Sequence, residues 1–344
     1  MKLNIGNILR RLFYKFGIYI KYIPNIDHLY NYLHGKDDAH KFYELKYICY
    51  VVALSNDNNF YNQIIKRYVP DWDIEARAST FIGEGSGVYN LNTYRKLELY
   101  NNNTLFEKTY LTKSLDYEKI IFIKDNILNL LDDKIKTPQI KFKYTSDFIT
   151  VIYYEYLDLA PFSSENINEY FVEITKFLYK KSTESKVESM ITKAPEILKD
   201  YSLFHDYMRF EEEAKDFLHQ LSIDYNCIEK KINKARKVIT HGDIKRENFY
   251  EGDYLIDWDH FGLYPIGLEV ALVCSKLIIY KLLEETPLNW LYTNYKSMLD
   301  ENEWELFELS FSYFLFIFSY RHIHKAEFSK FKSELIETFK TNEQ

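Results

Sequence analysis

The chain has 344 residues, of which 47% are hydrophobic and 18% aromatic, and its formal net charge is −7. This length suffices for two or three packed units, and the hydrophobic content excludes a disordered chain. The acidic balance excludes a generally basic nucleic-acid-binding protein, so we expect no nucleic-acid partner. Three widely spaced cysteines show no metal-ligand pattern and favour a reducing cytoplasm. No secretory signal or apolar run of membrane-spanning length is found.

The first 72 residues have a helical pattern and are predicted to form an N-terminal extension. Apolar residues recur at three- and four-residue steps from Ile5 to Phe16, with basic residues between them and no acid before Asp27. Such a helix either packs on a neighbouring domain or lies on an anionic membrane surface through residues 1–22. Both alternatives remain open at this point.

From residue 74 the pattern changes to short strands separated by turns. Alternating apolar residues flank a glycine turn, and the asparagine triplet 101–103 and Ser146-Asp147 mark two more turns. Ser114 is the expected N-cap of a helix with apolar residues at helical period. After Pro161 the chain is mainly helical, and its most apolar stretch, 309–320, is expected to be a buried helix. The predicted strands lie in 76–100 (two strands), 104–111, 140–145 and 148–157, and the predicted helix spans 115–131.

The glycine turn between the first two strands is a candidate phosphate-binding loop. It holds three of the ten glycines in the chain, and glycines let backbone N–H groups approach phosphate oxygens without a Cβ in the way. Taken alone, a glycine turn of this kind is usually an ordinary hairpin. The candidate residues are Gly83, Gly85, Ser86 and Gly87.

Lys108, in the strand at 104–111, is a candidate cation for nucleotide phosphates. An exposed lysine on a two-faced sheet is the alternative, and the functional interpretation gains from the glycine turn before it and the helix after it. An acid on that helix would hold the ammonium in place. Glu118 is the first choice for this acid, with Asp125 as the alternative.

The segment 238–262, VITHGDIKRENFYEGDYLIDWDHFG, carries the strongest chemical signal. Asp243 can accept the proton of a substrate hydroxyl as a phosphoryl group is transferred to it. Asn248 and Asp257 supply an amide oxygen and a carboxylate, which suit a hard cation such as Mg²⁺. A turn at 251–253 is predicted to bring Asp257 back beside Asn248.

This segment resembles the aminoglycoside phosphotransferase and choline kinase superfamily, relatives of the protein kinases. The family patterns H-G-D-x-x-x-x-N and I-D-W occur here from His241 to Asn248 and at 256–258, and the resemblance covers roughly residues 74–275. It implies that Asp243 is the catalytic base within the catalytic set His241, Asp243 and Lys245, and that Asn248 and Asp257 are Mg²⁺ ligands.

The same resemblance implies roles for residues outside the catalytic segment. Lys108 would contact the α and β phosphates and pair with Glu118, and the backbone from Glu155 to Leu157 would bind adenine. The segment 265–271 resembles a P-x-x-x-D-L-A brace of the catalytic loop, with Glu269 in place of aspartate. Lys245 stands where Ser/Thr protein kinases carry lysine and this superfamily often carries histidine, so a protein-kinase-like activity stays open as an alternative.

These observations together predict an α+β, bilobal protein-kinase-like fold. We expect a helical extension over 1–72, a small β-rich nucleotide-binding lobe over 73–157, and a larger helical catalytic and substrate-binding lobe over 158–344. The expected function is ATP- and Mg²⁺-dependent phosphoryl transfer to a hydroxyl of a small molecule, such as an aminoglycoside, amino alcohol or sugar, in the cytoplasm. One alternative is a lipopolysaccharide or capsule sugar kinase at the inner membrane face, and another is a pseudokinase-like binding module.

Overall fold

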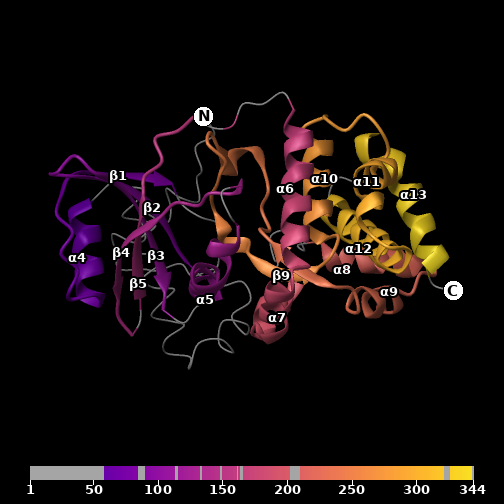
Figure 1. Ribbon diagram of the computed structural model, residues 1–344, viewed down its shortest axis with the longest axis horizontal. Helices are drawn as coiled ribbons and strands as arrows, with labels where there is room; N and C mark the ends of the chain where they lie inside the picture. The colour runs from indigo at the N-terminus through magenta and orange to yellow at the C-terminus, as the bar shows by residue number, and fades with distance from the viewer. Residues whose placement is uncertain are drawn as a thin grey trace, which may run out of the picture. The chain divides into compact units, whose positions relative to one another are not determined.

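The computed structural model divides the chain into two compact units (Figure 1). The first comprises Met1–Phe122 and Thr137–Asp158, and the second comprises Ile123–Lys136 and Leu159–Gln344. The segment 123–136, which the sequence placed in the β-rich lobe, therefore groups with the helical unit. The structure describes residues 58–83, 90–112, 115–131, 134–147, 149–160, 162, 166–201, 210–320 and 326–342.

The first unit is built on a five-stranded antiparallel sheet with the order β1-β2-β3-β5-β4. All five predicted strands are confirmed. Asn102, in the β2–β3 turn, has a φ of 65°, a conformation that asparagine tolerates better than most residues. The strands are β1 (Ala76–Gly83), β2 (Asn90–Leu99), β3 (Thr104–Leu111), β4 (Ile140–Thr145) and β5 (Ile149–Glu155).

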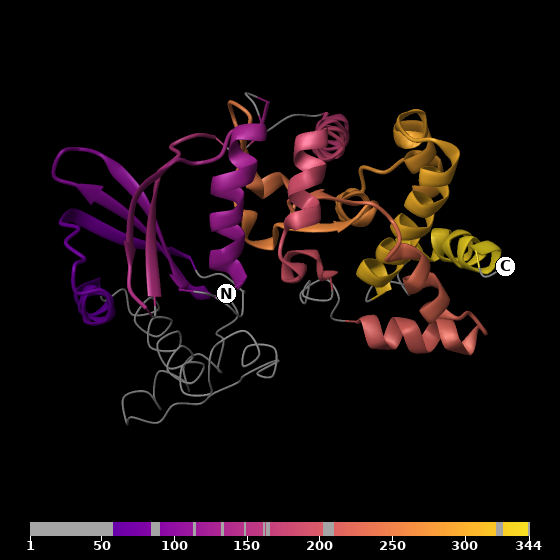
Figure 2. The same ribbon diagram turned by 60° about the horizontal axis from the view of Figure 1, so that its bottom comes forward.

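The two helices that the structure describes in this unit lie on opposite faces of the sheet (Figures 1 and 2). On one face, Ile120 of α5 (Leu115–Phe122) packs against Tyr110 and Ile152. On the other face, α4 (Asn58–Tyr68) buries Tyr61 completely. Because side chains alternate along a strand, consecutive residues of β3 point to different helices.

The helix predicted over 115–131 is confirmed as helical, although its geometry changes along its length. After α5 comes a π-helical turn, Ile123–Ile127, and then a 3₁₀ turn, Leu128–Leu130. Ile123 and Ile127 are buried on the π turn.

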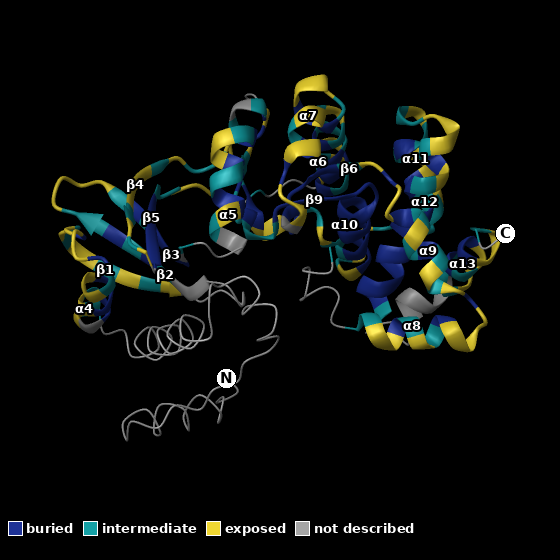
Figure 3. Cartoon of the chain, turned by 90° about the horizontal axis from the view of Figure 1, so that it is seen from below, coloured by how far each residue is buried: buried dark blue, intermediate teal, exposed yellow. Residues whose placement is uncertain are grey.

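The second unit is mainly helical, as predicted, and its core lies around α10 and α12. Asp224, Thr286 and Asp300 cap α9, α11 and α12 by accepting backbone N–H groups. Helix α10 is buried along almost its whole length (Figure 3), and α12 buries the apolar stretch 309–319 as expected. The helices are α6 (Ile167–Ser182), α7 (Ser185–Lys193), α8 (Glu211–Gln220), α9 (Tyr225–Ile232), α10 (Leu268–Ile279), α11 (Pro287–Tyr295), α12 (Glu301–Ser319) and α13 (Ala326–Asn342).

Four short strands in the second unit carry the segment 238–262, which holds the candidate catalytic residues. β6 (Lys237–Thr240) pairs with β9 (Gly262–Pro265), and β7 (Phe249–Tyr250) pairs with β8 (Tyr254–Leu255). Because Thr240 pairs with Gly262, residues 241–261 form one connection between the adjacent ends of two paired strands.

A β-sheet unit followed by a larger helical unit is the α+β arrangement that the sequence predicted. The part of the N-terminal extension that the structure describes, α4, is helical as expected, and residues 1–57 lie outside the described residues. Of the helices in the described ranges, none has the length and apolar composition needed to cross a membrane.

Candidate active site

A glycine at position 242 allows the segment 238–262 to leave β6 in a tight turn. Gly242 has a φ of 84°, and a Cβ at this position would lie 2.3 Å from the backbone oxygen of His260. No side chain fits in that space, and the left-handed conformation itself favours glycine. The turn places the next residue, Asp243, in a buried position with 3% of its surface exposed.

The Asp243 carboxylate is held by two neighbours from its own segment. Asn248 Nδ2 donates to the backbone oxygen of Asp243 at 2.9 Å and to Asp243 Oδ2 at 3.1 Å. Lys245 Nζ forms an ion pair with the same Oδ2. An amide and an ammonium thus fix the direction of a buried carboxylate, as a general base requires.

The hairpin of β7 and β8 returns Asp257 to the neighbourhood of Asn248. The predicted turn is confirmed, with Gly252 and Asp253 both at positive φ. The N–H of Ile256 donates to the backbone oxygen of Asn248 at 3.0 Å, and Asp257 is the next residue. Asp257 itself is left-handed, with a φ of 64°.

The donor set of Asn248 and Asp257 fits Mg²⁺. The nitrogen of the Asn248 amide is used by Asp243, so its oxygen is the atom suited to bind a cation. Within the described ranges, no group of three or more His, Cys, Asp or Glu side chains could hold a metal. One carboxylate and one amide oxygen, completed by phosphate oxygens and water, match the way proteins hold Mg²⁺ at nucleotide sites.

His241 connects the two halves of the segment from a fully buried position. Its Nδ1 accepts the N–H of Asp243 at 3.2 Å, and its Nε2 lies 2.9 Å from the oxygen of Ile256. The ring meets Trp258 edge-on at 4.6 Å. Burial lowers the pKa of His241 to about 4, so the ring is neutral at pH 7 and Nε2 carries the proton. These contacts give His241 a positioning role between Asp243 and Asp257.

Glu269, in the first turn of α10, holds the backbone of the same turn. Its two carboxylate oxygens accept the N–H of Gly242 at 3.0 and 3.3 Å, and only 5% of the residue is exposed. Burial raises the pKa of Glu269 to about 7, although the backbone hydrogen bonds act in the opposite direction. The Glu269 carboxylate thus braces the turn at Gly242.

The raised pKa of Glu269 leads to a prediction for the pH dependence of stability. Between pH 4.5 and about 7 the folded chain keeps a proton that the unfolded chain releases, so this carboxyl lowers the free energy of unfolding as pH rises. Glu269→Gln lacks this effect but keeps an oxygen for Gly242. The free energy of unfolding is measured in urea for both proteins. The value for Glu269→Gln minus that for the unaltered chain should be larger at pH 8 than at pH 4.5, by on the order of 3 kcal/mol.

His241 acts in the opposite sense below pH 6.5, because its folded pKa is lowered. That contribution is present in both proteins, so it cancels in their difference. A difference in unfolding free energy that stays constant from pH 4.5 to 8 would contradict the assignment of the buried proton to Glu269.

In the first unit, Lys108 lies on the central strand β3 and is buried, with 5% of its surface exposed. Its ammonium lies 4.9 Å from the ring centre of Tyr94 and 5.6 Å from that of Tyr110. Glu118 and Asp125 are both exposed, and no ion pair joins either of them to Lys108 among the described side chains. The pairing of Lys108 with Glu118 remains a prediction.

The candidate adenine-binding segment follows β5. The N–H of Glu155 donates to Gln139 at 2.9 Å, and that of Tyr156 donates to Thr104 at 3.3 Å. In the described part of the chain, no acceptor meets the N–H of Leu157. A backbone donor at this position suits an adenine ring nitrogen.

The phosphate-binding loop lies largely outside the described residues. Gly83 is the last residue of β1 and pairs with Tyr94. Gly85, Ser86 and Gly87 fall in the range 84–89, which the structure does not describe. Ser114 and residues 1–22 also lie outside the described residues. The proposed roles of these residues stay predictions.

The sequence did not single out Arg95 and Glu107, which form a buried ion pair on the first unit's sheet. A usable signal was present. The β2–β3 turn pairs Glu98 with Thr104, and the same register places Arg95 directly opposite Glu107. Opposite charges at facing positions of a hairpin favour a cross-strand pair.

The chain is similar in architecture to solved structures of antibiotic phosphotransferases. A spectinomycin phosphotransferase in complex with ADP and spectinomycin is 15% identical, with 82% of this chain and 93% of that chain covered and a TM-score of 0.44. An amicoumacin kinase is 13% identical, with coverages of 82% and 93% and a TM-score of 0.41. A macrolide 2′-phosphotransferase from Brachybacterium faecium is 8% identical, with coverages of 82% and 98% and a TM-score of 0.40. No protein-family model and no curated protein sequence matches the chain.

Proposed function

We propose that this protein is an ATP- and Mg²⁺-dependent phosphotransferase that acts on a hydroxyl group of a small molecule. The observation that carries the proposal is the buried Asp243 carboxylate, held by Asn248 and Lys245 in one segment with Asp257. A fixed base, a nearby cation and oxygen ligands for a metal are the parts that phosphoryl transfer needs.

In the proposed reaction, Asp243 accepts the proton of the acceptor hydroxyl. The hydroxyl oxygen forms a bond to the γ-phosphorus of ATP, and the bond from that phosphorus to the bridging oxygen breaks, which releases ADP. The ammonium of Lys245, beside Asp243, supplies positive charge where the phosphoryl group is transferred. Asn248 and Asp257 would hold Mg²⁺, which when bound neutralises phosphate charge.

The first unit would bind the nucleotide. Lys108 would contact the α and β phosphates, and the backbone from Glu155 to Leu157 would bind adenine. The buried position of Lys108 and the available N–H of Leu157 support these roles. His241 and Glu269 would act through the catalytic turn rather than on the substrate.

The acceptor class follows from the resemblance of the catalytic segment: aminoglycosides, amino alcohols and sugars. The membrane-face alternative depends on residues 1–22, which lie outside the described residues. We expect the protein to act in the cytoplasm.

The proposal is tested by incubating the purified full chain with ATP, Mg²⁺ and a panel of these acceptors. Mass spectrometry should find one acceptor class that gains the mass of a phosphoryl group, with ADP formed in equal amount. A chain that binds the nucleotide but phosphorylates no acceptor across a broad panel would support the pseudokinase-like alternative.

A further inference from the structure

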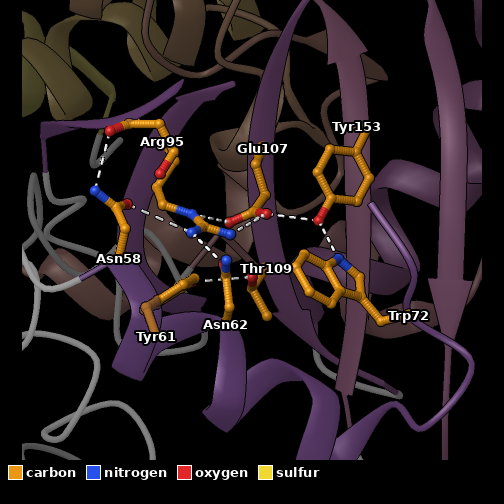
Figure 4. A network of polar contacts seen from close by, with 9 residues as sticks. Asn58, Tyr61, Asn62, Trp72, Arg95, Glu107, Thr109 and Tyr153 are labelled. Carbon is orange, nitrogen blue, oxygen red and sulfur yellow. Dashed lines mark hydrogen bonds and ion pairs between the residues drawn. The ribbon is translucent and has the colours of Figure 1, made fainter. Parts of the chain in front are cut away.

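A buried ion pair lies on the face of the sheet that α4 covers (Figure 4). Arg95 on β2 donates from Nε to Glu107 Oε1 at 2.7 Å and from Nη2 to Glu107 Oε2 at 2.6 Å. Neither side chain has more than 1% of its surface exposed. Two parallel hydrogen bonds between buried side chains fix the relative position of the two strands closely.

The pair continues into a network that ends on α4 and on Trp72. Tyr153 of β5 donates to Glu107 at 2.5 Å and lies 2.5 Å from the indole nitrogen of Trp72, which donates to it. Burial and the Glu107 carboxylate raise the pKa of Tyr153, which keeps the phenol a proton donor. Arg95 donates to Asn62 of α4 at 2.6 Å.

Helix α4 also covers the guanidinium with an aromatic ring. The Cζ atom of Arg95 lies 4.3 Å from the ring centre of Tyr61, and the Tyr61 hydroxyl lies 3.3 Å from Thr109 Oγ1. Removal of α4 would leave a charged pair on an open sheet face without these contacts. Residues 58–72, which the sequence assigned to the extension, thus pack on the sheet of the first unit.

The network lies on the opposite face of the sheet from the Lys108 side chain. Glu107 and Lys108 are consecutive on β3, so their side chains point to opposite faces of the sheet. The strand neighbours of Glu107 are Arg95 and Tyr153, and those of Lys108 are the adjacent residues Tyr94 and Ile152. Hydrogen bonds therefore connect β2, β3 and β5 on one face of the sheet, and Lys108 projects from the other face of β3.

We propose that Arg95 and Glu107 are positioning residues that set the place of the Lys108 ammonium for the nucleotide phosphates. This inference rests on the proposed function, because it assumes that Lys108 contacts the nucleotide. In this view, residues on the face that α4 covers affect nucleotide binding indirectly, through the position of Lys108, without contact with the nucleotide.

Glu107→Gln tests the inference because it keeps the shape of the side chain and removes its charge. We expect the KM for ATP to rise roughly 10-fold, since a small displacement of a positioned charge has a large effect on binding. The kcat at saturating ATP should change by less than about threefold. Glu98→Gln is the matched control, because Glu98 of β2 pairs with Arg77 of β1 at 3.1 Å in an exposed position, and the KM for ATP of this variant should stay unchanged.

A second variant separates positioning from folding. Replacement of both partners, Arg95→Met with Glu107→Leu, removes the buried charges together and should restore most of the melting temperature that Glu107→Gln loses. We expect the KM for ATP to stay raised in this double variant. A KM that recovers together with the melting temperature would overturn the positioning role and leave a purely structural one.

The outcomes distinguish this inference from the proposed function. If the unaltered chain binds no Mg²⁺-nucleotide, the proposed function fails and the positioning role fails with it. If the unaltered chain binds the nucleotide and both variants bind it equally well, only the positioning role fails. Trp72 is the one tryptophan of the first unit, so its fluorescence, obtained as the difference from Trp72→Phe, reports whether the network is intact in each variant.

Discussion

Asp243→Asn is expected to lower the kcat of phosphoryl transfer by roughly 10²–10⁴-fold, the range that a general base contributes. The asparagine can accept a hydrogen bond but cannot take the proton of the acceptor hydroxyl. Its amide is close in shape to the carboxylate, so the contacts from Asn248 and Lys245 constrain the variant to nearly the same place. The affinity for the nucleotide should therefore stay within about threefold of the original.

Steady-state kinetics with the acceptor found in the panel, together with equilibrium nucleotide binding, measure both quantities. Asp253→Asn is the control, since it makes the same chemical change at an exposed position of the β7–β8 turn and should leave kcat unchanged. An Asp243→Asn variant with unaltered turnover would exclude Asp243 as the base.

Asp257→Asn is expected to abolish most of the Mg²⁺ dependence of nucleotide binding and to lower kcat by roughly 10²–10³-fold, as loss of one group that stabilises transition-state charge does. Asparagine tolerates the left-handed conformation that Asp257 adopts at a φ of 64°, so the backbone is retained and only the charge is lost. The loss should appear as a weaker affinity for the cation.

Titration of Mn²⁺ in the presence of ADP, followed by electron paramagnetic resonance, measures that affinity directly. Asp253→Asn again serves as a control, because Asp253 has nearly the same φ, 66°, in the same hairpin. Equal Mn²⁺ affinity in Asp257→Asn and the unaltered chain would remove Asp257 from the metal site.

Local patterns predicted the strands and the catalytic hairpin because short-range chemistry fixes them. The β2–β3 hairpin follows from alternating residues around an asparagine turn, and the return of Asp257 follows from the turn at Gly252. Asn248 could be placed for the same reason, since its partners Asp243 and Ile256 lie in the same segment.

Features that depend on distant packing could not be predicted from the sequence. The pKa of Glu269 depends on its burial in the first turn of α10, and the exposed position of Glu118 depends on which face of α5 packs on the sheet. The docking of α4 depends on Arg95, 33 residues beyond Asn62. A local sequence pattern gives no information on contacts between residues so far apart. The sequence therefore predicts residues 58–72 as part of an extension and not as a helix that packs on the sheet.

The central claim is that this chain binds a nucleotide through Mg²⁺ in order to transfer its phosphoryl group. Isothermal titration of a non-hydrolysable ATP analogue into the full chain, with and without Mg²⁺, tests it without knowledge of the acceptor. We predict binding of one nucleotide per chain that depends on Mg²⁺ and weakens in Asp257→Asn. No heat of binding at any Mg²⁺ concentration, from a chain shown to be folded by circular dichroism, would contradict the account.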